Sequence, residues 1–222
     1  MTAFGPMNYI DYKKKIEFSK EEYDEIDKYC NMHKIQWFAS AWDVESVNFL
    51  SQYKLPFIKI ASPSVTDIEL INKIKSTSKS VIMSTGMSTK EEIDKSIGIL
   101  DGNLKYILHT TSSYPTPNNE MNMRAIKTLQ TLYGNKYKIG FSNHCIDLIY
   151  IVQSYIMGAE MIEFHITLDR NLPGTDQFAS IGPIGFDKIM KHINNIYVGW
   201  GDGTLKVQDS EIPIKKKLRR ST

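Results

Sequence analysis

The 222-residue chain lacks the features that mark several large classes of protein. Its two cysteines, Cys30 and Cys145, form no CxxC pair, so neither a disulfide framework nor a thiolate zinc site is indicated, and both thiols suit a reducing compartment. No apolar run approaches the roughly 18 residues of a membrane span, and the N-terminus has no signal-peptide pattern. We therefore expect a cytoplasmic protein with no membrane role.

The chain also lacks an excess of charge of either sign. Its 27 Lys and Arg residues against 25 Asp and Glu residues leave a net charge of +2, which gives no reason to expect a nucleic-acid partner. One basic run, KKKLRR, lies at residues 215–220. We interpret residues 201–222 as a basic, solvated tail or linker.

One repeated pattern stands out: six short β-like runs, of which five end in serine and the last in histidine. The runs are IQWFAS, FIKIAS, SVIMS, YILHTTS, YKIGFS and MIEFH, which end at Ser40, Ser62, Ser84, Ser112, Ser142 and His165. Successive ends are 22 to 30 residues apart, enough for one strand, one helix and two loops. Because the active site of a barrel enzyme lies where its parallel strands end, the pattern predicts both an architecture and the place of the chemistry.

The alternation of strands and helices predicts an α/β protein. A doubly wound open sheet is the alternative, but no GxGxxG follows a first strand, and polar residues end every strand rather than only those at a switch point. We therefore predict a TIM (β/α)8-type barrel, which usually has about 250 residues. About six of the eight β/α units are recognisable, so we predict a truncated barrel over residues 19–200, after an irregular segment at residues 1–18.

Two histidines follow neighbouring strands of this predicted barrel. His144 comes two residues after the KIGFS strand, and His165 ends MIEFH one β/α unit later, so both should face the same rim. They could share a divalent metal, or each could be an ordinary hydrogen-bonded histidine. Glu163 lies two residues before His165, on the same face of its strand, where it could orient a metal-bound water, act as a base or form a salt bridge.

A lysine and several hydroxyl groups belong to the same rim. Lys59 is enclosed by apolar residues in PFIKIAS, and a buried ammonium group needs an anion. Together with the five serines it could form a phosphate cradle, although serines also end strands simply as turn residues. Gly86, in the STGM loop, allows close approach of a ligand to the backbone. Asp176, in the loop after the last strand, could bind a sugar hydroxyl or belong to a turn.

Seven segments carry a resemblance to a known family. They are WFASAWD (37–43), KIAS (59–62), STGM (84–87), HTTSSYPTP (109–117), GFSNH (140–144), EFHITLDR (163–170) and PGTDQFAS (173–180). In sequence, order and spacing they resemble the sialic acid synthase family, also called the N-acetylneuraminate synthase family. The match extends from about residue 7 to residue 220 and is highly specific as a combination.

The resemblance implies an α/β barrel transferase that condenses phosphoenolpyruvate with an N-acylated amino sugar, N-acetylmannosamine or its 6-phosphate. The products would be a sialic-acid-type nonulosonic acid and phosphate. A divalent metal, Mn²⁺ or Mg²⁺, is expected on His144 and His165, and Glu163 and Lys59 are the catalytic candidates. The resemblance assigns phosphoenolpyruvate to Ser40, Lys59, Ser62, Ser84, Ser112 and Ser142, and the sugar to Tyr114 and Asp176. A homodimer is expected for full-length members.

The chain departs from the family pattern at both ends. The first two family strands, which normally carry an A-E-I-G-x-N-H segment and a lysine, have no counterpart here. Residues 201–222 stand where many members continue into a small antifreeze-like domain. Two alternatives therefore stay open: a non-catalytic fragment or subunit of such an enzyme, and another metal-dependent, aldolase-type barrel.

Overall fold

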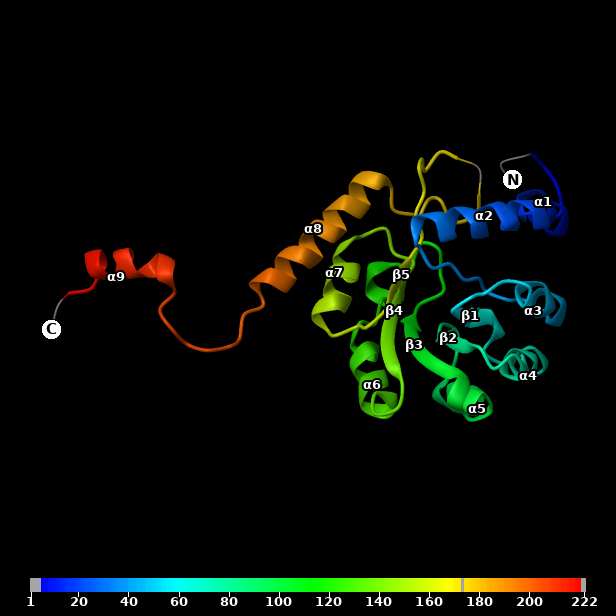
Figure 1. Ribbon diagram of the computed structural model, residues 1–222, viewed down its shortest axis with the longest axis horizontal. Helices are drawn as coiled ribbons and strands as arrows, with labels where there is room; N and C mark the ends of the chain where they lie inside the picture. Colours follow the sequence, from blue (N-terminus) through cyan, green and yellow to red (C-terminus); the bar gives the residue numbers. More distant parts are fainter. Residues whose placement is uncertain (1–4, 173, 221–222) are drawn as a thin grey trace.

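The computed structural model describes residues 5–172 and 174–220, and within these ranges it contains one parallel sheet in the order β1-β2-β3-β4-β5 (Figure 1). The strands are β1 (Phe57–Ile60), β2 (Ser80–Ser84), β3 (Leu104–Thr110), β4 (Lys138–Asn143) and β5 (Ile162–Phe164). The helices are α1 (Tyr9–Ile16), α2 (Lys20–His33), α3 (Val44–Leu50), α4 (Ile68–Ser76), α5 (Lys90–Leu100), α6 (Arg124–Tyr133), α7 (Ile149–Ile156), α8 (Pro183–Gly199) and α9 (Ile212–Leu218). From β1 to α8 each strand is followed by a helix, which is the repeated β/α unit that the sequence predicts.

An ion pair shows that this sheet is strongly curved. Lys59 lies on β1 and Glu163 on β5, the two outermost strands. In a flat sheet these strands would be about 19 Å apart, because neighbouring strands are about 4.8 Å apart. Lys59 Nζ nevertheless lies 2.6 Å from Glu163 Oε1. The strands therefore form part of a barrel wall, which confirms the predicted truncated α/β barrel.

The register of the strands decides which side chains share the concave face. Thr110, Ser142 and Glu163 are aligned across β3, β4 and β5. Because alternate residues of a strand face the same side, Leu108 shares this face with Thr110, and Ser84 on β2 is aligned with Leu108. The polar positions of the concave face thus lie at the carboxyl ends of the strands.

The main apolar core lies between the strands and the helices that follow them. It includes fully buried residues of the strands and of α4, among them Ile58, Ile60, Val81, Met83, Ile107, Phe141, Ile71 and Ile74. A smaller cluster formed by Ile151, Ile181 and Ile189 joins α7 to α8. Since the strands are covered on both faces, they read as nearly continuous apolar runs in the sequence.

Several helices begin at residues whose side chains cap the free backbone N–H groups. Ser19 and Glu22 form a capping box at the start of α2, and Thr89 and Glu92 form another at the start of α5. Asp43 accepts a hydrogen bond from the Ser46 backbone N–H at the start of α3. These caps fix the points at which the three helices begin.

Two predictions about the N-terminal part are wrong. Residues 35–40, expected to be the first of six strands, form only an isolated parallel bridge between Ser40 and Lys59, so the described residues contain five strands. The segment lies beside β1, but only the Lys59 N–H reaches across, to the Ala39 carbonyl, so no ladder forms. The segment 1–18, expected to be irregular, contains α1, because Asn8 caps its first turn. Residues 1–4 of that segment lie outside the described residues.

The C-terminal part leaves the barrel. Helix α8 packs against α7 and β5, whereas α9 lies well away from the strands, and the segment between the two helices makes a long exposed connection (Figure 1). Residues 201–220 are exposed throughout, including α9 with its basic run. No helix in the described part of the chain combines the length and apolarity needed to cross a bilayer.

Candidate functional site

A cavity of about 550 Å³ lies at the carboxyl ends of the strands. It is lined by every site residue predicted from the sequence: Ser40, Lys59, Ser62, Ser84, Ser112, Tyr114, Ser142, His144, Glu163, His165 and Asp176. These residues come from segments up to 136 positions apart in the chain, from Ser40 to Asp176. The β/α repeat brings them together because it returns each strand end to the same rim.

The Glu163 carboxylate joins two of the candidate residues. Its Oε1 atom accepts a hydrogen bond from Lys59 Nζ at 2.6 Å and another from Ser142 Oγ at 2.9 Å. The Lys59 side chain is only 11% exposed and that of Glu163 29%. A buried ammonium group requires such an anionic partner, so the carboxylate explains how Lys59 is tolerated inside the apolar PFIKI run.

His144 is held as a neutral imidazole with a defined tautomer. Its Nδ1 atom lies 2.8 Å from the Thr111 carbonyl, which can only accept, so Nδ1 carries the proton. Burial lowers the pKa of His144 to about 4, and Nε2 therefore presents a lone pair. The Tyr114 hydroxyl donates to Nε2 over 2.9 Å, and burial raises the pKa of Tyr114 to about 12, so the phenol stays protonated. A fixed tautomer with an unprotonated Nε2 is what a metal-binding histidine needs, and a cation bound there would take the place of the Tyr114 hydroxyl.

His165 completes the arrangement. Its ring centroid is 5.5 Å from those of both His144 and Tyr114, and its Nδ1 atom lies 3.7 Å from Asp176 Oδ2. Two imidazoles at this separation are a donor set that suits a divalent cation. Among the described residues, however, no three His, Cys, Asp or Glu side chains are placed to hold one ion. The protein would therefore supply two imidazoles, and water or substrate the remaining ligands.

Two serine side chains, Ser62 and Ser112, lie next to Gly86 at the same cavity. The Gly86 N–H donates to Ser62 Oγ over 3.1 Å, and Gly86 packs against the Ser112 side chain. The buried hydroxyls of Ser84 and Ser112 have no hydrogen-bond partner among the described residues. Such groups are rare in folded proteins and indicate a place where a ligand or water binds.

The cavity also contains residues that the sequence analysis did not select. Phe38 and Trp42 line it from the segment before α3, Met87 from the loop after β2, and Lys13 from α1. Trp42 is 60% exposed and Met87 68%, and both give an apolar edge to a polar site. Lys13 had no detectable signal, because its segment was expected to be irregular. Trp42 stands within the WFASAWD segment and could have been selected there.

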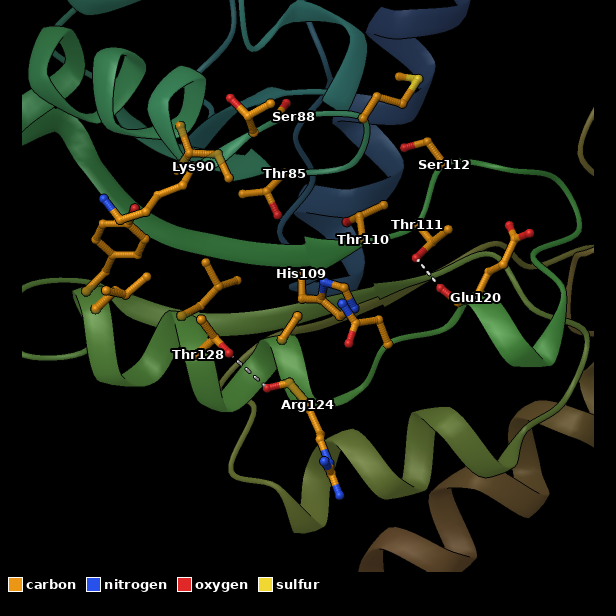
Figure 2. A pocket seen from close by; sticks show the side chains of 18 of the residues that line it. Thr85, Ser88, Lys90, His109, Thr110, Thr111, Ser112, Glu120, Arg124 and Thr128 are labelled. Carbon is orange, nitrogen blue, oxygen red and sulfur yellow. Dashed lines mark hydrogen bonds between the residues drawn. The ribbon is translucent and has the colours of Figure 1, made fainter.

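A second, larger cavity of about 980 Å³ lies between α5 and α6 (Figure 2). It adjoins the first at Met87, Thr110 and Ser112, which line both. The hydroxyls of Thr85 and Thr111 donate to backbone carbonyls, each over 3.0 Å, and Figure 2 shows Arg124 extending away from the other lining side chains. Most of its polar side chains thus serve the fold, and none of the predicted site residues except Ser112 reaches it.

The fold and the first cavity together define a (β/α)-barrel domain with a polar candidate ligand-binding site at the carboxyl ends of its strands. The chain belongs to the NeuB family, whose model matches residues 3–204. This confirms the predicted membership in the sialic acid synthase group. Pro173, in one of the segments that carry the resemblance, lies outside the described residues.

Individual relatives agree. The chain is 31% identical to the N,N'-diacetyllegionaminic acid synthase of Campylobacter jejuni, over 99% of this chain and 67% of that protein. It is also 31% identical to the N-acetylneuraminate-9-phosphate synthase of Drosophila melanogaster, over 84% of this chain and 51% of that protein. The chain thus spans about half to two thirds of the length of these relatives.

A solved structure shows the same fold. The crystal structure of the sialic acid synthetase of Leptospira borgpetersenii, in complex with citrate, superposes with a TM-score of 0.79 at 31% identity. The match covers 92% of this chain and 73% of that one. These relatives are thus synthases of nonulosonic acids.

Proposed function

We propose that this cavity binds phosphoenolpyruvate and an N-acylated amino sugar and supports their condensation to a nonulosonic acid and phosphate. The observation that carries the proposal is the joint placement, in one cavity, of unpartnered serine hydroxyls, a buried lysine and two facing imidazoles. In this reaction C3 of phosphoenolpyruvate bonds to the sugar aldehyde carbon, water adds at C2, and phosphate leaves. An anion, an aldehyde and a water must all be held.

The hydroxyl cluster and Lys59 suit the anion. Ser62, Ser84 and Ser112 offer neutral donors, and the ammonium group of Lys59, whose side chain is only 11% exposed, offers a positive charge. Lys59 is paired with Glu163, so an incoming phosphate competes with the carboxylate for it. The Glu163 carboxylate is then placed to accept a proton from the water that adds.

The two histidines suit a divalent cation, Mn²⁺ or Mg²⁺. The Nε2 lone pair of His144 and the nearby His165 ring would hold it. When bound, such an ion polarises a carbonyl oxygen as a Lewis acid. We assign the sugar to Tyr114, which lies beside both rings, and to Asp176, which lies beside His165.

The named relatives act on differently substituted sugars, so the sugar class is proposed only as an N-acylated amino sugar. The test has two parts. First, phosphoenolpyruvate binding to the 222-residue chain is measured by titration calorimetry with Mn²⁺ present. Second, phosphate release is measured with phosphoenolpyruvate alone, with N-acetylmannosamine, with its 6-phosphate and with a di-N-acetylated sugar.

We expect binding of phosphoenolpyruvate, and phosphate release that requires both substrates, with a 2-keto acid product detected by mass spectrometry. Binding without turnover would favour the non-catalytic subunit over the enzyme. Absence of phosphoenolpyruvate binding would contradict the proposed function.

A further inference from the structure

Gly86 lies in contact with two of the serines that the proposed function assigns to phosphoenolpyruvate. A Cβ atom at position 86 would stand 2.1 Å from Ser112 Oγ and 2.9 Å from Ser62 Oγ. Both distances are shorter than any van der Waals contact, and the Ser112 Cβ atom is close as well, at 3.2 Å. The backbone of Gly86 needs no left-handed conformation, since its φ lies outside the positive range. A side chain at position 86 would therefore have to displace both serine hydroxyls, so the constraint on this glycine is steric and does not come from its torsion angles.

Gly86 also orients the hydroxyl group of Ser62. Its N–H donates to Ser62 Oγ, so that oxygen acts as an acceptor toward the backbone, and the Ser62 proton is left to point elsewhere. Ser112 Oγ has no partner among the described residues, and so its proton is likewise uncommitted. By contrast, the Ser142 proton is already given to Glu163.

We propose that Gly86 is a positioning residue: it holds the Ser62 and Ser112 hydroxyls side by side, with their protons directed at an anion of phosphoenolpyruvate. The inference rests on the proposed function and adds to it. Among the five rim serines it distinguishes Ser62 and Ser112, the donor pair beside Gly86, from Ser142, which donates to Glu163. Any side chain at position 86 displaces both donors at once, whereas a change at Ser112 alone removes one.

The test is a double-variant cycle on the 222-residue chain. Phosphoenolpyruvate affinity is measured by calorimetry for wild type, G86A, S112A and G86A/S112A, and thermal unfolding is followed in parallel. We expect G86A to weaken binding by at least about tenfold, the loss that follows from misplacing one hydrogen bond to a charged group. G86A/S112A should bind no more weakly than G86A, because S112A removes a donor that G86A already displaces. It should also unfold at a higher temperature than G86A, because the closest clashing atom is gone.

Gly98 provides the matched control. It lies on α5, and a Cβ atom there would meet no atom within 4 Å. G98A should therefore leave phosphoenolpyruvate affinity unchanged. If G86A alone does not fold, recovery of folding in G86A/S112A is the expected result, and a double variant that is equally unfolded contradicts the contact.

The outcomes separate this inference from the proposed function. Wild-type binding together with an unaltered affinity in G86A overturns the role of Gly86 and leaves the proposed function standing. Losses that multiply in the double variant also overturn it, because they show that Gly86 does not act through Ser112. A wild-type chain that does not bind phosphoenolpyruvate overturns both.

Discussion

The two adjoining cavities differ in what their polar groups do. In the larger one, between α5 and α6, hydroxyls such as those of Thr85 and Thr111 donate to backbone carbonyls. In the smaller one, Ser84 and Ser112 retain unpartnered hydroxyls, and the charged pair Lys59–Glu163 lies at its wall. The larger cavity also has unpartnered hydroxyls, those of Ser113 and of Ser112, which lines both cavities. The comparison teaches that the charged pair and the two facing imidazoles, rather than volume or unpartnered hydroxyls, mark the candidate site.

The largest expected difference between the cavities concerns their histidines. His144→Ala should reduce Mn²⁺ affinity by at least about 100-fold, because one of two imidazole ligands is lost. His109, which lines the larger cavity, bonds through Nε2 to the Met121 carbonyl, and burial lowers its pKa. His109→Ala should lower stability by about 2 kcal/mol and leave Mn²⁺ affinity unchanged.

Calorimetric titration with Mn²⁺ measures the metal affinity of both variants, and denaturant unfolding measures their stability. Equal Mn²⁺ affinity in His144→Ala and wild type would remove His144 from the metal assignment.

The second expected effect concerns the charged pair of the smaller cavity. Glu163→Ala leaves the Lys59 ammonium group mostly buried and without its carboxylate, so stability should fall by about 3 kcal/mol. The pair Lys136–Asp101 is exposed on both sides and offers a matched control. Lys136→Ala should leave the unfolding midpoint unchanged. Similar midpoints for both variants in urea unfolding would show that Lys59 does not depend on Glu163.

A smaller effect is expected for two consecutive serines. Ser112 lines both cavities, whereas Ser113 lines only the larger one, and neither hydroxyl has a partner among the described residues. Ser112→Ala should weaken phosphoenolpyruvate binding by about tenfold. Ser113→Ala should leave it unchanged. Calorimetry compares phosphoenolpyruvate affinity in two variants with the same chemical change. An equal loss of affinity in both would show that the two cavities do not differ in phosphoenolpyruvate binding.

The smallest effect is expected at Thr128 in the larger cavity. Its hydroxyl lies 3.5 Å from the Arg124 carbonyl within the exposed part of α6, a weak bond. Thr128→Ala should change stability by less than about 0.5 kcal/mol and should not change phosphoenolpyruvate affinity. A measurable loss of phosphoenolpyruvate affinity in this variant would show that the larger cavity takes part in binding.

The sequence predicted the rim because its signal is periodic: a serine or histidine ends each apolar run, and the β/α repeat makes sequence spacing equivalent to position on the rim. Contacts between distant units have no such signal. Lys59 and Glu163 are 104 residues apart, and nothing in the spacing joins them. The contact of Gly86 with Ser112 is likewise invisible before the loops are placed.

The errors have physical causes too. Residues 35–40 have the composition of a strand, but a strand needs a ladder of hydrogen bonds, and only one bridge to β1 forms. The composition of a segment indicates whether its backbone favours an extended conformation, whereas hydrogen bonding in a sheet also depends on the strand beside it. The α1 helix was missed because its start depends on one local bond, from the Asp11 N–H to Asn8 Oδ1.

The Lys59–Glu163 ion pair connects the curvature of the sheet with the charge available in the smaller cavity, because it joins β1 to β5 and also lines that cavity. The same carboxylate that draws β1 toward β5 also occupies the cation that a phosphate would seek. Under the proposed function, binding of the phosphate would therefore weaken the ion pair between β1 and β5, and the energy of that exchange would be subtracted from its affinity. Ligand affinity and the spacing of these two strands would then be coupled.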